Sequence, residues 1–215
     1  MTDLTTFESA KKTSTRFLGL LLAGLLSSGV FAQTDEVVFS ASGDSSWRLY
    51  LGSSSNWMVP VQGAVTTSHK SKVVTVSTIE NGSQANAIQA AWKGGLGQVY
   101  WQQDNPQDFR ALSEKGGALS LVIRIDKKPK KTVDLKMDCG YPCAGSLNMT
   151  KLFKTVPENQ WFRISMKISC FEKAGANLRN IIAPLVVATK GAFKMSISDV
   201  RLVTDVPEES VIPCD

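Results

Sequence analysis

The sequence predicts an all-β protein, built as a β-sandwich or jelly roll of two antiparallel sheets. Short runs rich in β-branched and aromatic residues recur between clusters of Gly, Ser, Asn and Pro, as is typical of strands joined by turns. Two of these runs, 119–125 and 162–168, carry an apolar side chain at every second position. Such alternation indicates strands that pack one face on a core and turn the other outward.

Eleven segments are expected to form strands, a suitable number for two packed sheets. In chain order they are 37–40, 47–52, 57–61, 72–79, 87–93, 98–102, 118–125, 133–137, 161–169, 184–189 and 193–202. Two segments are expected to be helical: a short turn over 108–112, and one helical turn within 170–178 that ends at Gly175.

The composition argues against several kinds of enzyme. The chain has 215 residues, too few for a (β/α)₈ barrel of about 250 residues. Its single histidine, His69, excludes a metal site that needs two histidines, and a Ser-His-Asp triad would depend on that one residue. The acidic residues show no paired pattern typical of a glycosidase, and no dinucleotide or Walker motif is present. We therefore predict no catalytic residues.

The first 32 residues have the pattern of a secretory signal peptide. Lys11, Lys12 and Arg16 precede an uncharged, Leu-rich run over 17–30, and cleavage is expected after Ala32. An apolar run of about 14 residues spans roughly 21 Å as a helix, less than the roughly 30 Å of a bilayer core. We therefore predict a secreted or periplasmic protein with no membrane span, a domain over 33–203 and a tail over 204–215.

Export favours disulfides among the four cysteines, Cys139, Cys143, Cys170 and Cys214. Four cysteines allow three connectivities, and the sequence does not decide between them. Three residues separate Cys139 from Cys143, instead of the two of redox and zinc motifs, and Gly140 with Pro142 favours a tight loop there. A structural bridge is therefore favoured over a redox or zinc centre.

The charge pattern does not indicate a nucleic-acid partner. The chain has 24 Lys plus Arg against 19 Asp plus Glu, a net charge of +5, and four of the lysines surround Pro129 in the segment 126–132. Nucleic-acid binding would call for aromatic residues among these charges, and this segment has none. We interpret it as a solvated loop between two strands.

The segment 87–103 is the most informative for binding, and we interpret it as a hairpin whose strands are joined by a turn over 94–97. The two-residue period then places amides and one aromatic ring on one face, while Trp92 and Trp101 face the core. Amides donate and accept hydrogen bonds and a ring offers an apolar platform, which suits a sugar. The predicted ligand-binding residues are Gln89, Trp92, Gln98, Tyr100 and Gln102.

Four blocks resemble a known family: AWKGGLGQVYWQ, LSLVIRIDKKPKKTVDLKMDCGYPC, WFRISMKISCFEKAGANL and APLVVATKGAFKMSISDVRL. Together they resemble the C-terminal galactose-binding-like domain of bacterial glycoside hydrolase family 3 glucan exo-hydrolases and β-glucosidases, over roughly 35–202. The resemblance implies a jelly-roll sandwich similar to carbohydrate-binding modules. The catalytic domains of that family are absent from this chain. Of the shared positions, only Trp92, Gln98 and Gln102 carry over as candidates.

The leading hypothesis is a secreted, non-catalytic module that binds β-glucan or a related glycan. The alternative is a structural or protein-interaction module that associates with an exported glycoside hydrolase and binds no sugar itself. Calcium is common in sandwich modules of this type, but no calcium-loop pattern supports it here, and no cofactor is predicted.

Overall fold

The fold is described from a computed structural model, which covers residues 35–40, 45–68, 72–81, 84–204 and 206–214. The predicted signal peptide over 1–32 lies outside these residues. The strands are β1 (Glu36–Ser40), β2 (Arg48–Ser53), β3 (Asn56–Pro60), β4 (Val65–Thr67), β5 (Val74–Asn81), β6 (Gln84–Trp92), β7 (Gly97–Gln102), β8 (Ala118–Lys127), β9 (Val133–Asp138), β10 (Ala144–Asn148), β11 (Trp161–Lys167), β12 (Ala183–Thr189), β13 (Phe193–Val203) and β14 (Val211–Ile212). The helices are α1 (Arg110–Glu114), α2 (Thr150–Thr155) and α3 (Ile168–Lys173), with 3₁₀ turns at Leu178–Asn180 and Glu208–Ser210.

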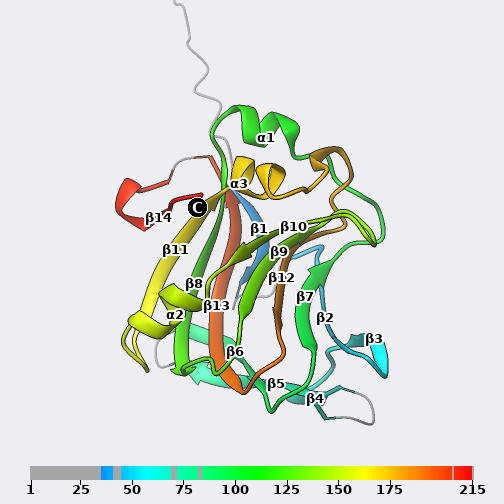
Figure 1. The fold of residues 1–215 in the computed structure, drawn as a ribbon, viewed down its shortest axis with the longest axis vertical. Coiled ribbons are helices and arrows are strands. Elements are labelled where there is room, and N and C mark those ends of the chain that lie inside the picture. The colour runs from blue at the N-terminus through cyan, green and yellow to red at the C-terminus, as the bar shows by residue number, and fades with distance from the viewer. Residues whose placement is uncertain (1–34, 41–44, 69–71, 82–83, 205, 215) are drawn as a thin grey trace, which may run out of the picture. The chain divides into compact units, whose positions relative to one another are not determined.

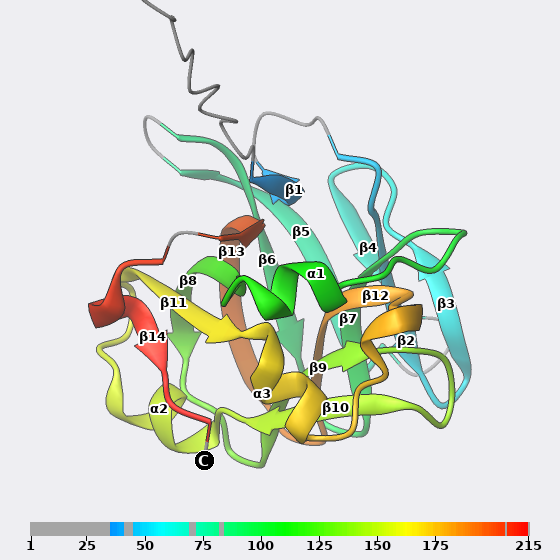
Figure 2. The same ribbon diagram turned by 90° about the horizontal axis from the view of Figure 1, so that it is seen from above.

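The strands form two sheets that lie in two layers (Figure 1). The eight-stranded sheet has the order β14-β11-β8-β13-β6-β5-β4, and β1 pairs with β13 beside this path. The six-stranded sheet has the order β10-β9-β12-β7-β2-β3. Pairing is antiparallel except between β11 and β14. Helices α1 and α3 lie side by side at one end of the sandwich (Figures 1 and 2). The predicted all-β sandwich is confirmed.

The core between the sheets is built from alternate residues of each strand. On β8 the buried side chains include Leu119, Leu121, Ile123 and Ile125, as the alternation predicts. The facing sheet contributes Val99 and Trp101 from β7, Leu135 and Met137 from β9, and Leu185 and Val187 from β12. Burying one such side chain contributes about 1.5 to 3 kcal/mol, so the alternation is the main determinant of the fold.

All eleven predicted strands overlap strands of the structure, and three short strands were missed: β4, β10 and β14. Strand β10 has the sequence AGSLN, which has no β-branched residue, and it is strand only because it pairs with β9. The predicted turn over 108–112 is α1, shifted by two residues. The predicted helical turn is α3, and Gly175 follows it with φ 107°. Helix α2 was not predicted.

The predicted hairpin over 87–103 is wrong. Strand β6 pairs with β5 and β13 in the eight-stranded sheet, whereas β7 pairs with β2 and β12 in the six-stranded sheet. The segment between them carries the chain from one layer to the other, and the indole N–H of Trp92 donates to the carbonyl oxygen of Gly97, at 3.1 Å. The two-residue period indicates which side chains face the core, but a hairpin and a crossover satisfy it equally well.

The cysteines form two disulfides, Cys139–Cys143 and Cys170–Cys214. The first closes the short loop between β9 and β10, where the Cys143 N–H also donates to the Gly140 carbonyl oxygen at 2.7 Å. The second joins α3 to the C-terminal tail, which also adds β14 to the edge of β11. In the described part of the chain, no helix is both long and apolar enough to cross a membrane.

Replacing both cysteines of a pair by alanine should destabilise the fold by an amount that grows with the logarithm of the length of the loop that the bridge closes. We expect the free energy of unfolding to fall by about 4 kcal/mol without Cys170–Cys214 and by about 2 kcal/mol without Cys139–Cys143, from chain entropy. Urea unfolding followed by tryptophan fluorescence measures both. Equal losses for the two double variants, which differ about tenfold in sequence separation (44 against 4), would contradict this account.

Candidate functional site

The outer face of the six-stranded sheet carries a hollow of about 710 Å³. We call it the outer trough. It is lined by Trp57, Leu96, Gln98, Lys136, Asp138, Tyr141, Pro142, Cys143, Ala144 and Val186. Aromatic, amide, cationic and anionic groups therefore converge on one sheet surface, from segments as far apart in the chain as β3 and β12.

The floor of the outer trough is low because the outward side chains of its central strand are small. On β12, Val186 stands between Tyr100 of β7 and Lys136 of β9 in the strand register. One pair further along, Ala188 stands next to Gln98 of β7. Larger groups on the flanking strands and turns form the walls.

Trp57 forms one wall, and a contact beneath it holds the backbone that carries the indole. The side chain is 44% exposed. The Tyr100 hydroxyl donates a hydrogen bond to the Trp57 carbonyl oxygen, at 2.9 Å. Gly52 makes this approach possible, because a Cβ atom there would lie 2.5 Å from the same carbonyl oxygen. The backbone that carries the indole is therefore fixed from below.

Tyr141 forms the opposite wall and is fully exposed, at 101%. It lies in the loop closed by the Cys139–Cys143 disulfide, where the Gly140 N–H also donates to Asp138 Oδ1 at 2.7 Å. Because a disulfide and backbone hydrogen bonds hold this loop, the tyrosine ring projects into solvent from a constrained base.

The structure separates the five predicted ligand-binding residues. Gln98 lies in the outer trough and is half-buried. Gln102 lies on the same face of β7, opposite Arg48, but does not line the trough. Tyr100 is 5% exposed and its ring stacks on Tyr50, with centroids 5.5 Å apart. The Tyr100 ring points away from the core, as expected, but it is covered and offers no exposed platform, so its place is beneath the site.

The other two predicted residues lie elsewhere. Gln89, on β6 of the eight-stranded sheet, donates through Nε2 to Asp126 Oδ2 at 3.1 Å. That carboxylate also accepts from Arg124 Nε and from Ser196 Oγ, both at 2.6 Å. Trp92 is 3% exposed, as the expectation that it faces the core requires, and its ring stacks on Phe193. Neither side chain can join a ligand in the outer trough.

Trp57 and Tyr141 were missed as site residues. The sequence signal for Trp57 is a tryptophan directly after the polar run SSSN, at the very start of an expected strand. The signal for Tyr141 is an aromatic residue inside a five-residue loop closed by cysteines, too short to bury its own side chain. In both places, an aromatic residue beside a polar turn or inside a short closed loop indicates a surface role.

The buried phenol of Tyr100 has altered acidity. Burial raises the pKa of Tyr100 to about 12, and the neighbouring Tyr50 and Asp138 act in the same direction. The hydroxyl therefore stays protonated at any physiological pH and remains a donor to the Trp57 carbonyl. Among the described residues, no group of three His, Cys, Asp or Glu is arranged to hold a metal ion.

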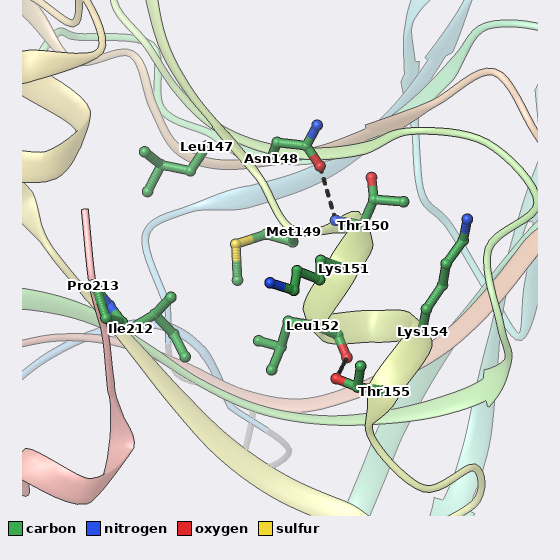
Figure 3. Close-up of a pocket in the computed structure, with 10 residues that line it drawn as sticks. All are labelled: Leu147, Asn148, Met149, Thr150, Lys151, Leu152, Lys154, Thr155, Ile212 and Pro213. Atoms are coloured by element: carbon green, nitrogen blue, oxygen red, sulfur yellow. Dashed lines mark hydrogen bonds between the residues drawn. The ribbon is translucent and has the colours of Figure 1, made fainter. Parts of the chain in front are cut away.

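A second hollow, of about 770 Å³, lies between α2 and the C-terminal tail (Figure 3). Two of its polar side chains are turned to the backbone of the helix: Asn148 Oδ1 accepts from the Thr150 N–H, and Thr155 Oγ1 donates to the Leu152 carbonyl oxygen, both at 2.9 Å. Met149, Leu152 and Ile212 leave it mainly apolar. Unlike the outer trough, it has no aromatic side chain among its lining residues.

Residues 45–202 match the model of a protein family described as galactose-binding domain-like. Among solved structures, the exo-1,3/1,4-beta-glucanase ExoP from a Pseudoalteromonas species is 18% identical over 83% of this chain, with a TM-score of 0.69. The match covers only 21% of ExoP. No match is found among curated proteins.

Two smaller structures match over nearly their whole length. The extra C-terminal domain of ExoP is 18% identical, over 82% of this chain and 96% of its own, with a TM-score of 0.67. The family 30 carbohydrate-binding module of a Clostridium thermocellum cellulosomal cellulase is 15% identical, over 81% of this chain and 99% of its own, with a TM-score of 0.57. The resemblance to a C-terminal galactose-binding-like domain is confirmed.

Removing the Tyr100 hydroxyl should change both stability and titration. In Tyr100→Phe we expect the free energy of unfolding to fall by about 1 kcal/mol, typical of one hydrogen bond. Alkaline absorbance titration should lose the ionisation near pH 12, one of three tyrosine ionisations. The wild-type protein should lose stability as the pH rises from about 10 towards about 12, because the unfolded chain ionises first, and the variant should lose less.

The matched control is Tyr141→Phe, which removes the hydroxyl of an exposed ring. It should leave both the ionisation near pH 12 and the free energy of unfolding unchanged. A titration in which this control, and not Tyr100→Phe, removes the most alkaline ionisation would show that the hydrogen bond beneath Trp57 is wrongly assigned.

Proposed function

Because the chain belongs to the galactose-binding domain-like family, we propose that it is a carbohydrate-binding module that holds a β-glucan or related glycan in the outer trough. The single observation that carries the proposal is the placement of two exposed aromatic walls, Trp57 and Tyr141, on either side of a low floor. The apolar face of a pyranose ring packs on such rings.

The groups between the two walls complement a sugar's hydroxyls. Gln98 both donates and accepts hydrogen bonds, the Lys136 ammonium donates and the Asp138 carboxylate accepts. A site with mainly apolar walls and a few polar groups at its base is typical of ligand sites. It also lies on strands and constrained turns, so little order has to be gained on binding.

We also propose a ligand class, a cellular location and a partner for this module. The glucanase whose extra C-terminal domain resembles this chain is named for action on 1,3/1,4-β-glucan, which supports a β-glucan as the ligand. Two disulfides are typical of an oxidising compartment, which supports a secreted or periplasmic location. The similar domain of ExoP is part of a glucanase, which supports a place beside an exported glycoside hydrolase.

Removing either aromatic wall should weaken glycan binding. In Trp57→Ala and in Tyr141→Ala we expect affinity for a soluble mixed-linkage β-glucan to fall at least about tenfold, because each removes a stacking surface. Trp57→Ala keeps the carbonyl oxygen to which Tyr100 donates, so the fold beneath should survive. Affinity electrophoresis ranks the variants, and circular dichroism checks that they remain folded.

Two further variants sharpen this test. Gln98→Ala should weaken binding only a few-fold, the loss expected of one hydrogen-bonding group. Gln89→Ala, on the eight-stranded sheet, is the matched control and should bind as the wild type does. If Trp57→Ala and Tyr141→Ala bind normally, the site is misplaced. If the wild type is retained on no polysaccharide, the structural or protein-interaction module is the better account.

A further inference from the structure

Two lysine-bearing turns meet at one end of the outer trough. One joins β8 to β9 and carries Lys130 and Lys131, and the other joins β12 to β13 and carries Lys190. The Lys130 N–H donates to the Ala192 carbonyl oxygen at 3.1 Å, and Thr189 Oγ1 donates to the Thr132 carbonyl oxygen at 2.8 Å. The backbones of the two turns are therefore fixed against each other.

The two turns pack so closely that glycine is required between them. A Cβ atom at Gly191 would lie 2.6 Å from Lys131 Cβ and 2.9 Å from the Lys131 backbone nitrogen. This contact holds the base of the Lys131 side chain in place next to Lys190. The two ammonium groups are thus presented from one constrained surface, although the ends of both side chains reach solvent.

A hollow of about 490 Å³ opens between these turns and the sheet. We call it the lysine end. It is lined by Leu96, Lys131, Thr132, Asp134, Lys136, Ala188, Thr189 and Lys190. Leu96 and Lys136 also line the outer trough, so the two hollows adjoin each other. From Asp138 to Asp134 along β9, four residues of strand cover about 13 Å.

The lysine end carries positive charge that the protein does not neutralise. Three lysines, Lys131, Lys136 and Lys190, line it against one carboxylate, Asp134. In the described ranges, the ion pairs within 4.0 Å are all made by arginines, and none includes these lysines. More lysines lie on the same turns and strand ends: Lys127, Lys128, Lys130 and Lys194. Because like charges repel one another, this cluster of lysines is stabilised when an anion binds among them.

We propose that the lysine end binds an acidic group, a carboxylate or a sulfate, on the glycan whose neutral part lies between Trp57 and Tyr141. This inference rests on the proposed function and narrows the ligand to an acidic polysaccharide. A polymer that follows the sheet from the outer trough passes directly over Lys136 and reaches Lys131 and Lys190. Lysine is a point charge with three donors, so it accepts either anion without a fixed fork geometry.

The experiment compares three forms of one mixed-linkage β-glucan oligosaccharide: neutral, carboxylated at C6 and sulfated at C6. Isothermal titration calorimetry is run at about 50 and about 500 mM salt, where exposed charges are weakly and strongly screened. At low salt we expect at least one acidic form to bind about tenfold more tightly than the neutral form. At high salt this advantage should disappear, and the tighter acidic form identifies the anion.

Variants assign the effect to the lysine end. The double variant Lys131→Gln with Lys190→Gln should bind the acidic form no more tightly than the neutral form, and its affinity for the neutral form should be unchanged. We call the tighter binding of the acidic form the acidic advantage. The matched control is Lys151→Gln with Lys154→Gln, on α2, which should keep the full advantage. The charge change is the same in both, so a general loss of positive charge would affect both equally.

Three results would overturn the inference. They are equal affinity for neutral and acidic forms, an acidic advantage that survives Lys131→Gln with Lys190→Gln, and equally tight binding of a single-stranded DNA oligomer that matches the acidic sugar in charge. Each of these leaves neutral-glycan binding, and with it the proposed function, intact. Failure to bind any of the three sugar forms overturns the proposed function as well.

Discussion

The packed core between the two sheets decides which side chain of every strand faces outward. Val99 and Trp101 point into it from β7, so Gln98, Tyr100 and Gln102 must point away. A shift of one residue would bury the glutamines and expose an indole, at a cost of several buried apolar side chains. Core packing therefore fixes the candidate site before any ligand is present.

The candidate site is built in two tiers on that outer face. The lower tier is a small apolar cluster of Tyr100, Ala183, Val186 and Ala188, with Tyr50 packed against it. The upper tier consists of Trp57 on β3, whose carbonyl oxygen accepts from the Tyr100 hydroxyl, and Tyr141 on its disulfide-closed loop. The lower tier contributes stability and the upper tier provides contact area, so substitutions can separate the two roles.

The fold could be predicted from the sequence because burial follows a simple period, and all eleven expected strands overlap observed ones. The partner of each strand could not be predicted, since Gly94-Gly95-Leu96-Gly97 reads as a hairpin turn and serves as a crossover. That one error placed Gln89 beside Gln98, although the two lie on different sheets. Trp57 and Tyr141 were missed for a related reason: the period does not show which distant segments meet on one face, and Trp57 comes from β3 and Tyr141 from the loop between β9 and β10.

The opposite face of the sandwich shows why outward polar residues alone do not define a site. On the eight-stranded sheet, Asp126 accepts hydrogen bonds from Gln89, Arg124 and Ser196, so the polar groups there satisfy one another. On the six-stranded sheet, Lys136 lies between two hollows with no carboxylate within ion-pairing distance among the described residues. Groups that are already paired stabilise the fold, whereas groups that are not are available to a ligand.

The most direct test is a crystal structure of the protein with a β-glucan tetrasaccharide. The account predicts sugar density on the outer face of the six-stranded sheet, with pyranose rings against Trp57 and Tyr141 and hydroxyls within hydrogen-bonding distance of Gln98. Density on the eight-stranded sheet, or in the hollow beside α2, with the outer trough empty, would contradict it.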